Sequence, residues 1–393
     1  MGLFLLYLTV ERVRLDRALR RVPRRIAVAG TRGKSSVTRL VAAGLRASGA
    51  RVLAKTTGSR PVLILPDGSE REIDRAGPAS VREQVRLVGL AASAGADTLV
   101  AEMMSIGPEC LDAESRGILR PGTLALTNAR LDHLDAMGRD KAAVARTLAS
   151  AFPRRAEVFV PEEEVVPAFE EAAARTGSRL RPVARAGGQG GGPERAGPGP
   201  LGEFEPNLRL ARAVLGHLGV DGAGIARGLA GAAPDPGSLR AWRVPLPDGP
   251  RNALCISLFA ANEPESSAAV LIKAREAVPF AGRPLVGILS LREDRGDRTL
   301  QWVRAAGQGF FRDFAFVVLV GPPSAAALRK IRRAPAAGGP AYSRVGASSP
   351  EVLMRRIASL TEDEPVVVGL GNFVGPGDAL VRYWSRTGTE HDR

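Results

Sequence analysis

The chain has 393 residues, 45% hydrophobic and 24% charged, so it is long enough for two or three folded domains and is neither disordered nor fibrous. Two isolated cysteines and three histidines exclude a disulfide framework and a Cys- or His-rich metal centre, and leave oxygen ligands with a hard cation as the open metal chemistry. The net charge of +14 favours an anionic partner, although all but five of the 55 basic residues are arginine, as a GC-rich genome would also produce. Because only 5% of the residues are aromatic, we predict no nucleic-acid partner.

The first predicted segment is 1–24, in which an apolar run over 1–10 precedes an arginine-rich stretch. About ten apolar residues are too few for the roughly 20 that span a bilayer. The order of charge and apolar run is also the reverse of a signal peptide. Two interpretations stay open: contact with an anionic membrane surface or a membrane partner, and an ordinary first helix packed on its own domain.

A phosphate-binding loop is predicted next, between a strand at 26–29 and a helix at 37–48 that leads to a strand from 52. In this context, backbone N–H groups and the helix N-terminus bind phosphate oxygens. Lys34 would reach the β- and γ-phosphates, and Ser35 would hold Mg²⁺. Val28 replaces the first glycine of the full Walker pattern, so the loop is a shorter form. The predicted nucleotide-binding residues are Gly30, Thr31, Arg32, Gly33, Lys34, Ser35 and Ser36.

Polar residues also follow predicted strands at 98–101 and 123–127. Ligands bind outside the carboxyl ends of parallel strands, so we expect these residues to meet the loop at one solvent-facing rim. Glu102 and His133 are candidate Mg²⁺ ligands, and Asn128 is a candidate nucleotide contact. The structural alternatives are a capping or ion-paired carboxylate for Glu102, and for His133 a loop histidine bonded to a neighbouring aspartate.

Together, the glycine-rich loop, Glu102 and the segment 127–135 resemble the Mur ligase superfamily of ATP-dependent amide-bond ligases. Within it, the chain is most similar to the PgsB or CapB type, the ligase subunits of poly-γ-glutamate synthases. The resemblance runs from about 23 to 384. It implies an α/β fold: a Mur-ligase-like P-loop ATPase domain with a doubly wound parallel sheet, and a smaller C-terminal Rossmann-like α/β domain. The strings that carry it lie at 30–40, 101–103, 132–138, 234–240, 259–266, 294–298 and 369–375.

The rest of the chain agrees with that organisation. A Gly/Pro-rich stretch near 186–200 reads as a surface loop, and an amphipathic helix follows from Asn207. The resemblance implies that Asn207 contacts the base, with a plain N-cap asparagine as the alternative. We predict an N-terminal segment over 1–24, a central domain over 25–235 and a C-terminal domain over 236–393.

A second doubly wound domain is predicted after the turn at 234–237, because strands and helices alternate there. Asp294 and Arg295 follow one of these strands and could close on ATP or substrate, although exposed Arg–Asp pairing explains such charges equally well. The predicted strands are 254–257, 285–289, 316–320 and 366–368, and the predicted helices are 266–275 and 351–360.

The resemblance implies an enzyme that activates the γ-carboxyl of glutamate as an acyl phosphate and joins it to the amine of another glutamate. Lys34, Glu102 and His133 would be catalytic, ATP and Mg²⁺ the cofactors, and growing poly-γ-glutamate the substrate. Membrane subunits of the PgsC and PgsA type would be partners, which implies a cytoplasmic location at the inner face of the membrane.

Two alternatives stay open: another P-loop NTPase or kinase, and a folylpolyglutamate-type ligase. From 142 to 272 the chain has no lysine to match the carbamylated lysine of many Mur ligases, so the number of metal ions is open as well.

Overall fold

The computed structural model describes residues 2–58, 61–75, 79–131, 134–185, 203–235, 239–247, 249–280, 282–346 and 349–391. Within it, one compact unit ends at Asp235 and a second begins at Pro236. Each unit is built around its own sheet.

The sheet of unit 1 has eight strands among the described residues, in the order β4-β3-β2-β5-β1-β6-β7-β8. The six strands from β2 to β8 in this order run parallel, whereas β3 and β4 are antiparallel to their neighbours. The predicted parallel sheet therefore carries an antiparallel edge. The strands are β4 (Glu70–Glu72), β3 (Val62–Ile64), β2 (Val52–Thr56), β5 (Thr98–Glu102), β1 (Arg24–Ala29), β6 (Thr123–Leu126), β7 (Glu157–Pro161) and β8 (Arg179–Val183).

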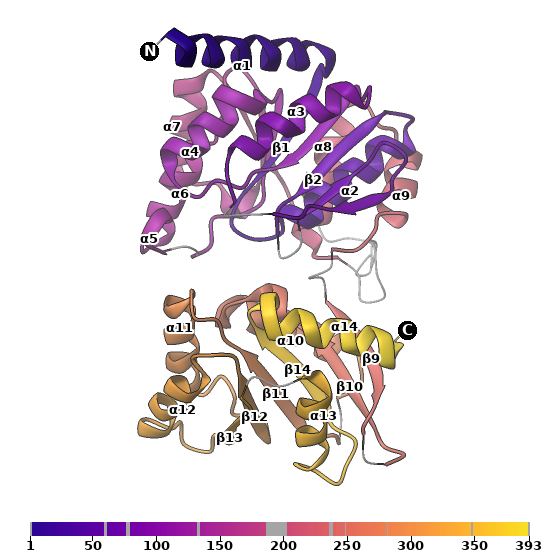
Figure 1. The fold of residues 1–393 in the computed structure, drawn as a ribbon, viewed down its shortest axis with the longest axis vertical. Helices are drawn as coiled ribbons and strands as arrows, with labels where there is room; N and C mark the ends of the chain where they lie inside the picture. Colours follow the sequence, from indigo (N-terminus) through magenta and orange to yellow (C-terminus); the bar gives the residue numbers. More distant parts are fainter. Residues whose placement is uncertain are drawn as a thin grey trace. The chain divides into compact units, whose positions relative to one another are not determined.

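Helices cover both faces of this sheet because its central strands are apolar on both sides (Figure 1). In β1, Ala27 belongs to the apolar cluster that includes residues of α1, α3, α6 and α7, and Val28 belongs to the cluster that includes residues of α2, α8 and α9. The helices are α1 (Gly2–Arg21), α2 (Lys34–Ala47), α3 (Arg82–Ser93), α4 (Pro108–Asp112), α5 (Leu134–Met137), α6 (Lys141–Ala149), α7 (Pro167–Thr176), α8 (Glu205–His217) and α9 (Gly222–Ala230), with the short helical segments η1 (Ala113–Leu119) and η2 (Glu162–Glu164).

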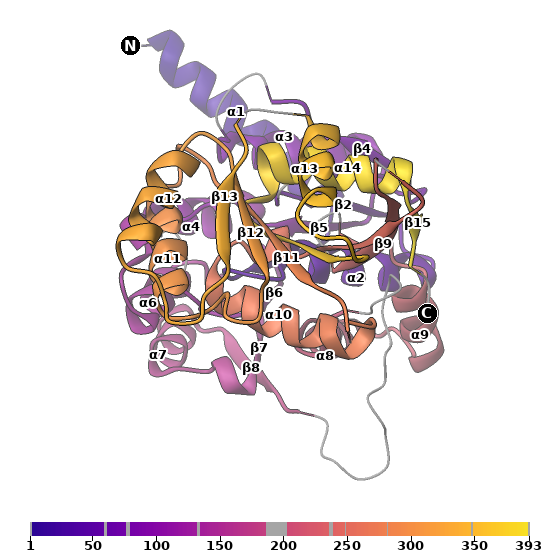
Figure 2. The ribbon, with the colours of Figure 1, turned by 90° about the horizontal axis from the view of Figure 1, so that it is seen from below.

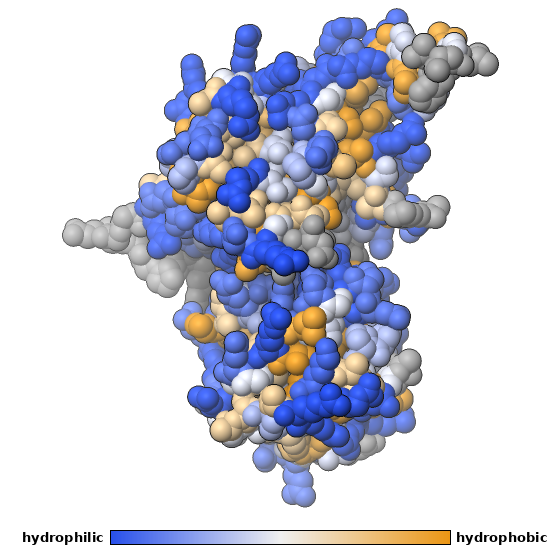
Figure 3. Space-filling model, turned by 90° about the vertical axis from the view of Figure 1, so that its left-hand side faces the viewer, coloured by the Kyte–Doolittle hydropathy of each residue, from blue (hydrophilic) through white to orange (hydrophobic). Residues whose placement is uncertain are grey.

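Helix α1 has a packed half and an exposed half. Its second half packs on unit 1 through the buried Leu15 and Leu19. Its first half extends past the rest of the unit (Figure 2) and exposes apolar side chains, with Leu6 59% and Tyr7 51% accessible. Apolar surface gathers at this end in Figure 3. Among the described residues, no helix is long and apolar enough to cross a membrane.

The sheet of unit 2 has seven strands among the described residues, in the order β13-β12-β11-β14-β10-β9-β15. Its centre is parallel, and β9 and β15 form an antiparallel edge. The strands are β13 (Ala341–Arg344), β12 (Phe316–Val320), β11 (Leu285–Ser290), β14 (Val366–Gly371), β10 (Asn252–Ser257), β9 (Arg240–Pro245) and β15 (Thr389–Glu390).

This second sheet is also covered on both faces. Helices α10, α11 and α12 pack on one face around Trp302, and α13 and α14 pack on the other around Trp384. The helices are α10 (Pro264–Ala277), α11 (Gly296–Gly307), α12 (Ser324–Arg333), α13 (Pro350–Ala358) and α14 (Asp378–Thr387), with the short segments η3 (Phe259–Ala261) and η4 (Phe373–Gly377).

Candidate functional site

The loop between β1 and α2 depends on two glycines with positive φ, Gly30 at +123° and Gly33 at +77°. A Cβ atom at Gly30 would lie 2.1 Å from Thr127 Oγ1, so no other residue fits there. Gly33 caps α2 without a side-chain hydrogen bond, which leaves the first N–H groups of a 14-residue helix to an outside acceptor. A helix N-terminus of this kind suits an anion such as phosphate.

Asn128 shapes this loop from the end of β6. Its Oδ1 accepts hydrogen bonds from Thr31 Oγ1 at 2.8 Å and from the Arg32 N–H at 3.1 Å, and its Nδ2 donates to the Arg32 carbonyl at 3.0 Å. Thr127 Oγ1 donates to the same carbonyl at 2.6 Å. The Asn128 side chain therefore braces the loop through both its donor and its acceptor.

Lys34, Ser35 and Glu102 lie together where β1 and β5 end. Lys34 Nζ donates to the Gly30 carbonyl at 2.9 Å, and Ser35 Oγ donates to Glu102 Oε2 at 2.8 Å. The Thr57 N–H donates to the same carboxylate oxygen at 2.8 Å. Glu102 is only 2% exposed, so the expectation of a solvent-facing position for this residue is wrong. The Glu102 carboxylate is thus held by two hydrogen bonds, from Ser35 and from Thr57.

The donor types at this position suit a hard cation, because a hydroxyl and a carboxylate are ligands that Mg²⁺ accepts together with nucleotide phosphates. Among the described residues, no three His, Cys, Asp or Glu side chains are grouped as a metal site. Ser35 and Glu102 together supply two of the ligands that a cation here would need. His133 lies outside the described residues.

Asn207 lies against the loop. A Cβ atom at Gly33 would lie 2.4 Å from Asn207 Oδ1, and Asn207 Nδ2 donates to Glu203 Oε1 at 3.0 Å. The N-cap of α8 is Phe204, so the alternative of an N-cap asparagine is wrong. Asn207 therefore reaches the loop from α8.

Asp294 and Arg295 belong to unit 2, between β11 and α11. Asp294 forms a bidentate pair with Arg292, with distances of 2.8 and 2.6 Å, and its side chain is 59% exposed. Burial would raise the pKa of this carboxyl, but the hydrogen bonds and charge of Arg292 lower it. The carbonyl of Arg295 accepts a hydrogen bond from Thr299 Oγ1. The exposed Arg–Asp pairing considered from the sequence is thus present.

Sequence reasoning missed two residues of this site, Thr57 and Thr127. Thr127 ends the predicted strand before Asn128, and its hydroxyl holds the loop. Thr57 directly follows β2, whose neighbour in the sheet is β5. The rule applied to β1, β5 and β6, that polar residues after parallel strands meet at one edge, applies to β2 as well and would have found Thr57.

Two family models match the chain. The Mur ligase middle domain matches residues 28–176, and the poly-gamma-glutamate synthase CapB C-terminal domain matches residues 244–387. The first match lies in unit 1 and the second in unit 2.

Two curated relatives are similar over most of the chain. The capsule biosynthesis protein CapB of Bacillus anthracis is 27% identical over 93% of this chain and 77% of the relative. The PGA synthase CapB of Bacillus subtilis (strain 168) is 26% identical over 75% of this chain and 74% of the relative.

Solved structures share the fold. E. coli FolC in complex with ADP aligns with a TM-score of 0.64 and 20% identity, covering 98% of this chain and 97% of its own. MurF from Acinetobacter baumannii aligns with a TM-score of 0.66 and 17% identity, covering 96% of this chain and 79% of its own. A bifunctional folylpolyglutamate synthase/dihydrofolate synthase with Mn, AMPPNP and L-glutamate bound aligns with a TM-score of 0.64 and 17% identity, over 95% of this chain and 93% of its own. The predicted fold class is confirmed.

Proposed function

Because this chain belongs to the Mur ligase superfamily, with a C-terminal domain of the CapB type, we propose that it is an ATP-dependent ligase that polymerises glutamate into poly-γ-glutamate. The observation that carries the proposal is the presence of both family matches in one chain, each within its own folded unit. The Mur-type half supplies the phosphate loop, and the CapB-type half separates this chain from the folate and cell-wall ligases that share its fold.

The reaction joins an amine to a carboxylate, which is uphill in water unless the carboxylate is first activated. ATP transfers its γ-phosphoryl group to the γ-carboxyl of glutamate, and the amine of another glutamate displaces phosphate from the acyl phosphate. In phosphoryl transfer the protein chiefly positions the groups and neutralises charge. We assign charge neutralisation to Lys34 and to the N-terminus of α2, whose N–H groups have no side-chain cap. Asn128 maintains the loop in that shape.

The metal that we propose is Mg²⁺, held by Ser35 and Glu102, with His133 as a further ligand. When bound, it would neutralise negative charge on the phosphates. Ser35 Oγ and Glu102 Oε2 lie 2.8 Å apart, so a cation would replace their hydrogen bond. If His133 is a ligand, His133→Ala requires more Mg²⁺ for half-maximal activity. An unchanged Mg²⁺ requirement would remove it from the ligand set.

We further propose that the chain works at the inner face of the membrane with subunits of the PgsC and PgsA type. The exposed apolar side chains in the first half of α1, among them Leu6 and Leu8, support attachment, because exposed apolar surface favours a membrane or protein partner. The net charge of +14 suits a product that is a polyanion.

The test is ADP release by membranes that carry this chain and its partners, with and without glutamate, with γ-linked polymer assayed in the same tubes. We expect ADP release that depends on glutamate and is accompanied by polymer, and none from the Lys34→Ala variant. ADP release indifferent to glutamate would favour an NTPase instead. Activity with a pteroyl substrate but without polymer would favour a folylpolyglutamate-type ligase.

A further inference from the structure

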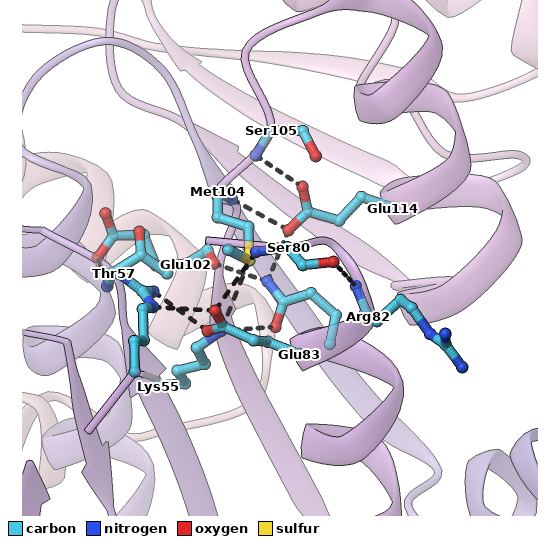
Figure 4. Close-up of polar contacts among 11 residues, drawn as sticks. Lys55, Thr57, Ser80, Arg82, Glu83, Glu102, Met104, Ser105 and Glu114 are labelled. Carbon is cyan, nitrogen blue, oxygen red and sulfur yellow. Dashed lines mark hydrogen bonds and ion pairs between the residues drawn. The ribbon is translucent and has the colours of Figure 1, made fainter. Parts of the chain in front are cut away.

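A buried polar network lies directly behind Glu102, on residues that the proposed reaction does not use (Figure 4). Its members are Lys55 on β2, Glu83 and Gln84 on α3, and Glu114 on η1. Lys55, Gln84 and Glu114 are at most 1% exposed. Burying so many polar groups is unfavourable unless each is hydrogen-bonded, so their arrangement calls for a reason.

One branch of the network holds the main chain at Glu102 and just after it. Gln84 Nε2 donates to the Glu102 carbonyl at 3.0 Å and to Glu114 Oε1 at 2.6 Å. Glu114 in turn accepts hydrogen bonds from the N–H groups of Met104 and Ser105, both at 3.0 Å. The chain leaves the sheet at this point, so these two side chains replace the contacts that a neighbouring strand would make.

The other branch holds β2, the strand that directly precedes Thr57. Lys55 lies two residues before Thr57, and its Nζ contacts Glu83 Oε2 at 3.0 Å. Glu83 also accepts two hydrogen bonds from Arg75, at 2.9 and 3.1 Å. Burial lowers the pKa of the Lys55 ammonium, whereas the hydrogen bond and charge of Glu83 raise it. Helix α3 thus contacts, through two successive residues, both segments that meet at the Glu102 carboxylate.

We propose that Gln84 and Glu114, together with the Lys55–Glu83 pair, are positioning residues that hold the Glu102 carboxylate between Ser35 and Thr57. This inference rests on the proposed function, in which Glu102 binds the metal of the ATP complex. The residues touch neither metal nor nucleotide and act through Glu102. Partners of this kind typically change metal affinity by about 10- to 100-fold when they are removed.

The experiment measures the affinity of the full chain for AMPPNP by calorimetry, once with Mn²⁺ and once with EDTA. The Kd in EDTA divided by the Kd with Mn²⁺ gives the gain in affinity due to the metal. This ratio separates the contribution of the metal from that of the phosphate loop. The test variants are Gln84→Met and Glu114→Gln. Gln84→Met removes the two hydrogen bonds that Gln84 donates and the one that it accepts from Lys55 Nζ at 3.5 Å, at similar side-chain length. Glu114→Gln is nearly isosteric. Arg86→Met, at an exposed position of the same helix, is the matched control.

We expect Gln84→Met and Glu114→Gln to reduce the ratio about tenfold, with the affinity in EDTA changed less than twofold and Arg86→Met behaving as the parent chain. In a Glu102→Gln background, Gln84→Met should have no further effect, since residues that act as one unit are not additive. If Gln84→Met unfolds, as its melting temperature would reveal, Glu114→Gln carries the test.

An unchanged ratio in the positioning variants, beside a reduced ratio in Glu102→Gln, would overturn this inference and leave the proposed function standing. Full additivity of Gln84→Met with Glu102→Gln would likewise overturn it. If Glu102→Gln keeps the parent ratio, the metal assignment in the proposed function is wrong, and the positioning role falls with it.

Discussion

Because Glu102 is buried, substitution by alanine and substitution by glutamine should have different effects on stability. Its carboxylate accepts hydrogen bonds from the Ser35 hydroxyl and the Thr57 N–H inside the unit. Replacement by alanine would leave both donors without an acceptor, at a cost of about 1–3 kcal/mol in the free energy of unfolding. Glu102→Gln keeps one acceptor oxygen, replaces the other by an NH2 group and removes the charge. We therefore expect Glu102→Gln to lose activity without a change in melting temperature. Glu102→Ala should lose activity and also have a lower melting temperature. Equal melting temperatures for the two variants would contradict this account.

Lys34 is a simpler case, because its side chain is not part of a core. Its Nζ donates to the Gly30 carbonyl of the same loop. Lys34→Ala should lower turnover by at least about 10²-fold, as expected for loss of a charge-stabilising donor, and leave the melting temperature unchanged. Turnover is measured as glutamate-dependent ADP release, with Lys330→Ala at an exposed position of α12 as the control. Full activity of Lys34→Ala would remove the loop from the mechanism.

At the scale of elements, sequence pattern predicted the central parallel strands β1, β2, β5, β6, β10, β11, β12 and β14, because each is a short apolar run followed by a turn. The parallel strands β7, β8 and β13 and the antiparallel strands β3, β4, β9 and β15 were missed. The central strand β2 is buried throughout, whereas every residue of β4 is exposed, so β4 lacks an apolar pattern. The loop residues could be predicted because glycine and lysine are required locally by phosphate chemistry. The network behind Glu102 could not, because Gln84 and Glu114 come together only when α3 and η1 pack on β5.

The contact between α2 and α9 depends on two glycines. A Cβ atom at Gly228 would lie 2.4 Å from the Gly44 Cα and 2.7 Å from the Gly44 N, so the two helices touch backbone to backbone. Gly228→Ala forces them apart and should lower the free energy of unfolding by about 1–3 kcal/mol. Gly89→Ala on α3 is the matched control, because a Cβ there meets nothing within 4 Å. There the intrinsic helix propensity should raise stability by about 0.5–1 kcal/mol. Urea unfolding measures both; a neutral Gly228→Ala would mean that the helices are not in contact.

Strand β10 offers a chemical test of the core of unit 2. Cys255 on this strand is fully buried, and burial raises the pKa of its thiol well above the ordinary value, while Cys110 on α4 is exposed. Since the thiolate is the reactive form, we expect one thiol to react with an aromatic disulfide reagent in the native chain at pH 8 and two in denaturant. The Cys110→Ser variant should show none in the native state. Rapid reaction of a thiol in that variant would indicate that β10 is not in the centre of a packed sheet.

At the scale of the whole molecule, the tryptophans report on one unit alone. All three, Trp242, Trp302 and Trp384, belong to unit 2 and are buried in its two cores. The phosphate loop belongs to unit 1. Tryptophan fluorescence therefore follows the unfolding of unit 2, whereas circular dichroism follows both units, and the two signals together separate the response of each unit to nucleotide.

This separation tests the expectation from the sequence that Asp294 and Arg295 close on ATP. A ligand stabilises only what it contacts in the folded state, by about 2.7 kcal/mol at a concentration 100 times its Kd. If unit 2 contributes these residues, saturating AMPPNP with Mn²⁺ raises the urea midpoint seen by tryptophan fluorescence, and the double variant Asp294→Asn, Arg295→Gln loses that shift. Its circular dichroism transition for unit 1 should still move, because the loop is intact, and Lys34→Ala should reduce the shift of that transition. A tryptophan midpoint indifferent to nucleotide in the parent chain would confine binding to unit 1 and leave Asp294 with only the role of pairing Arg292 at the surface.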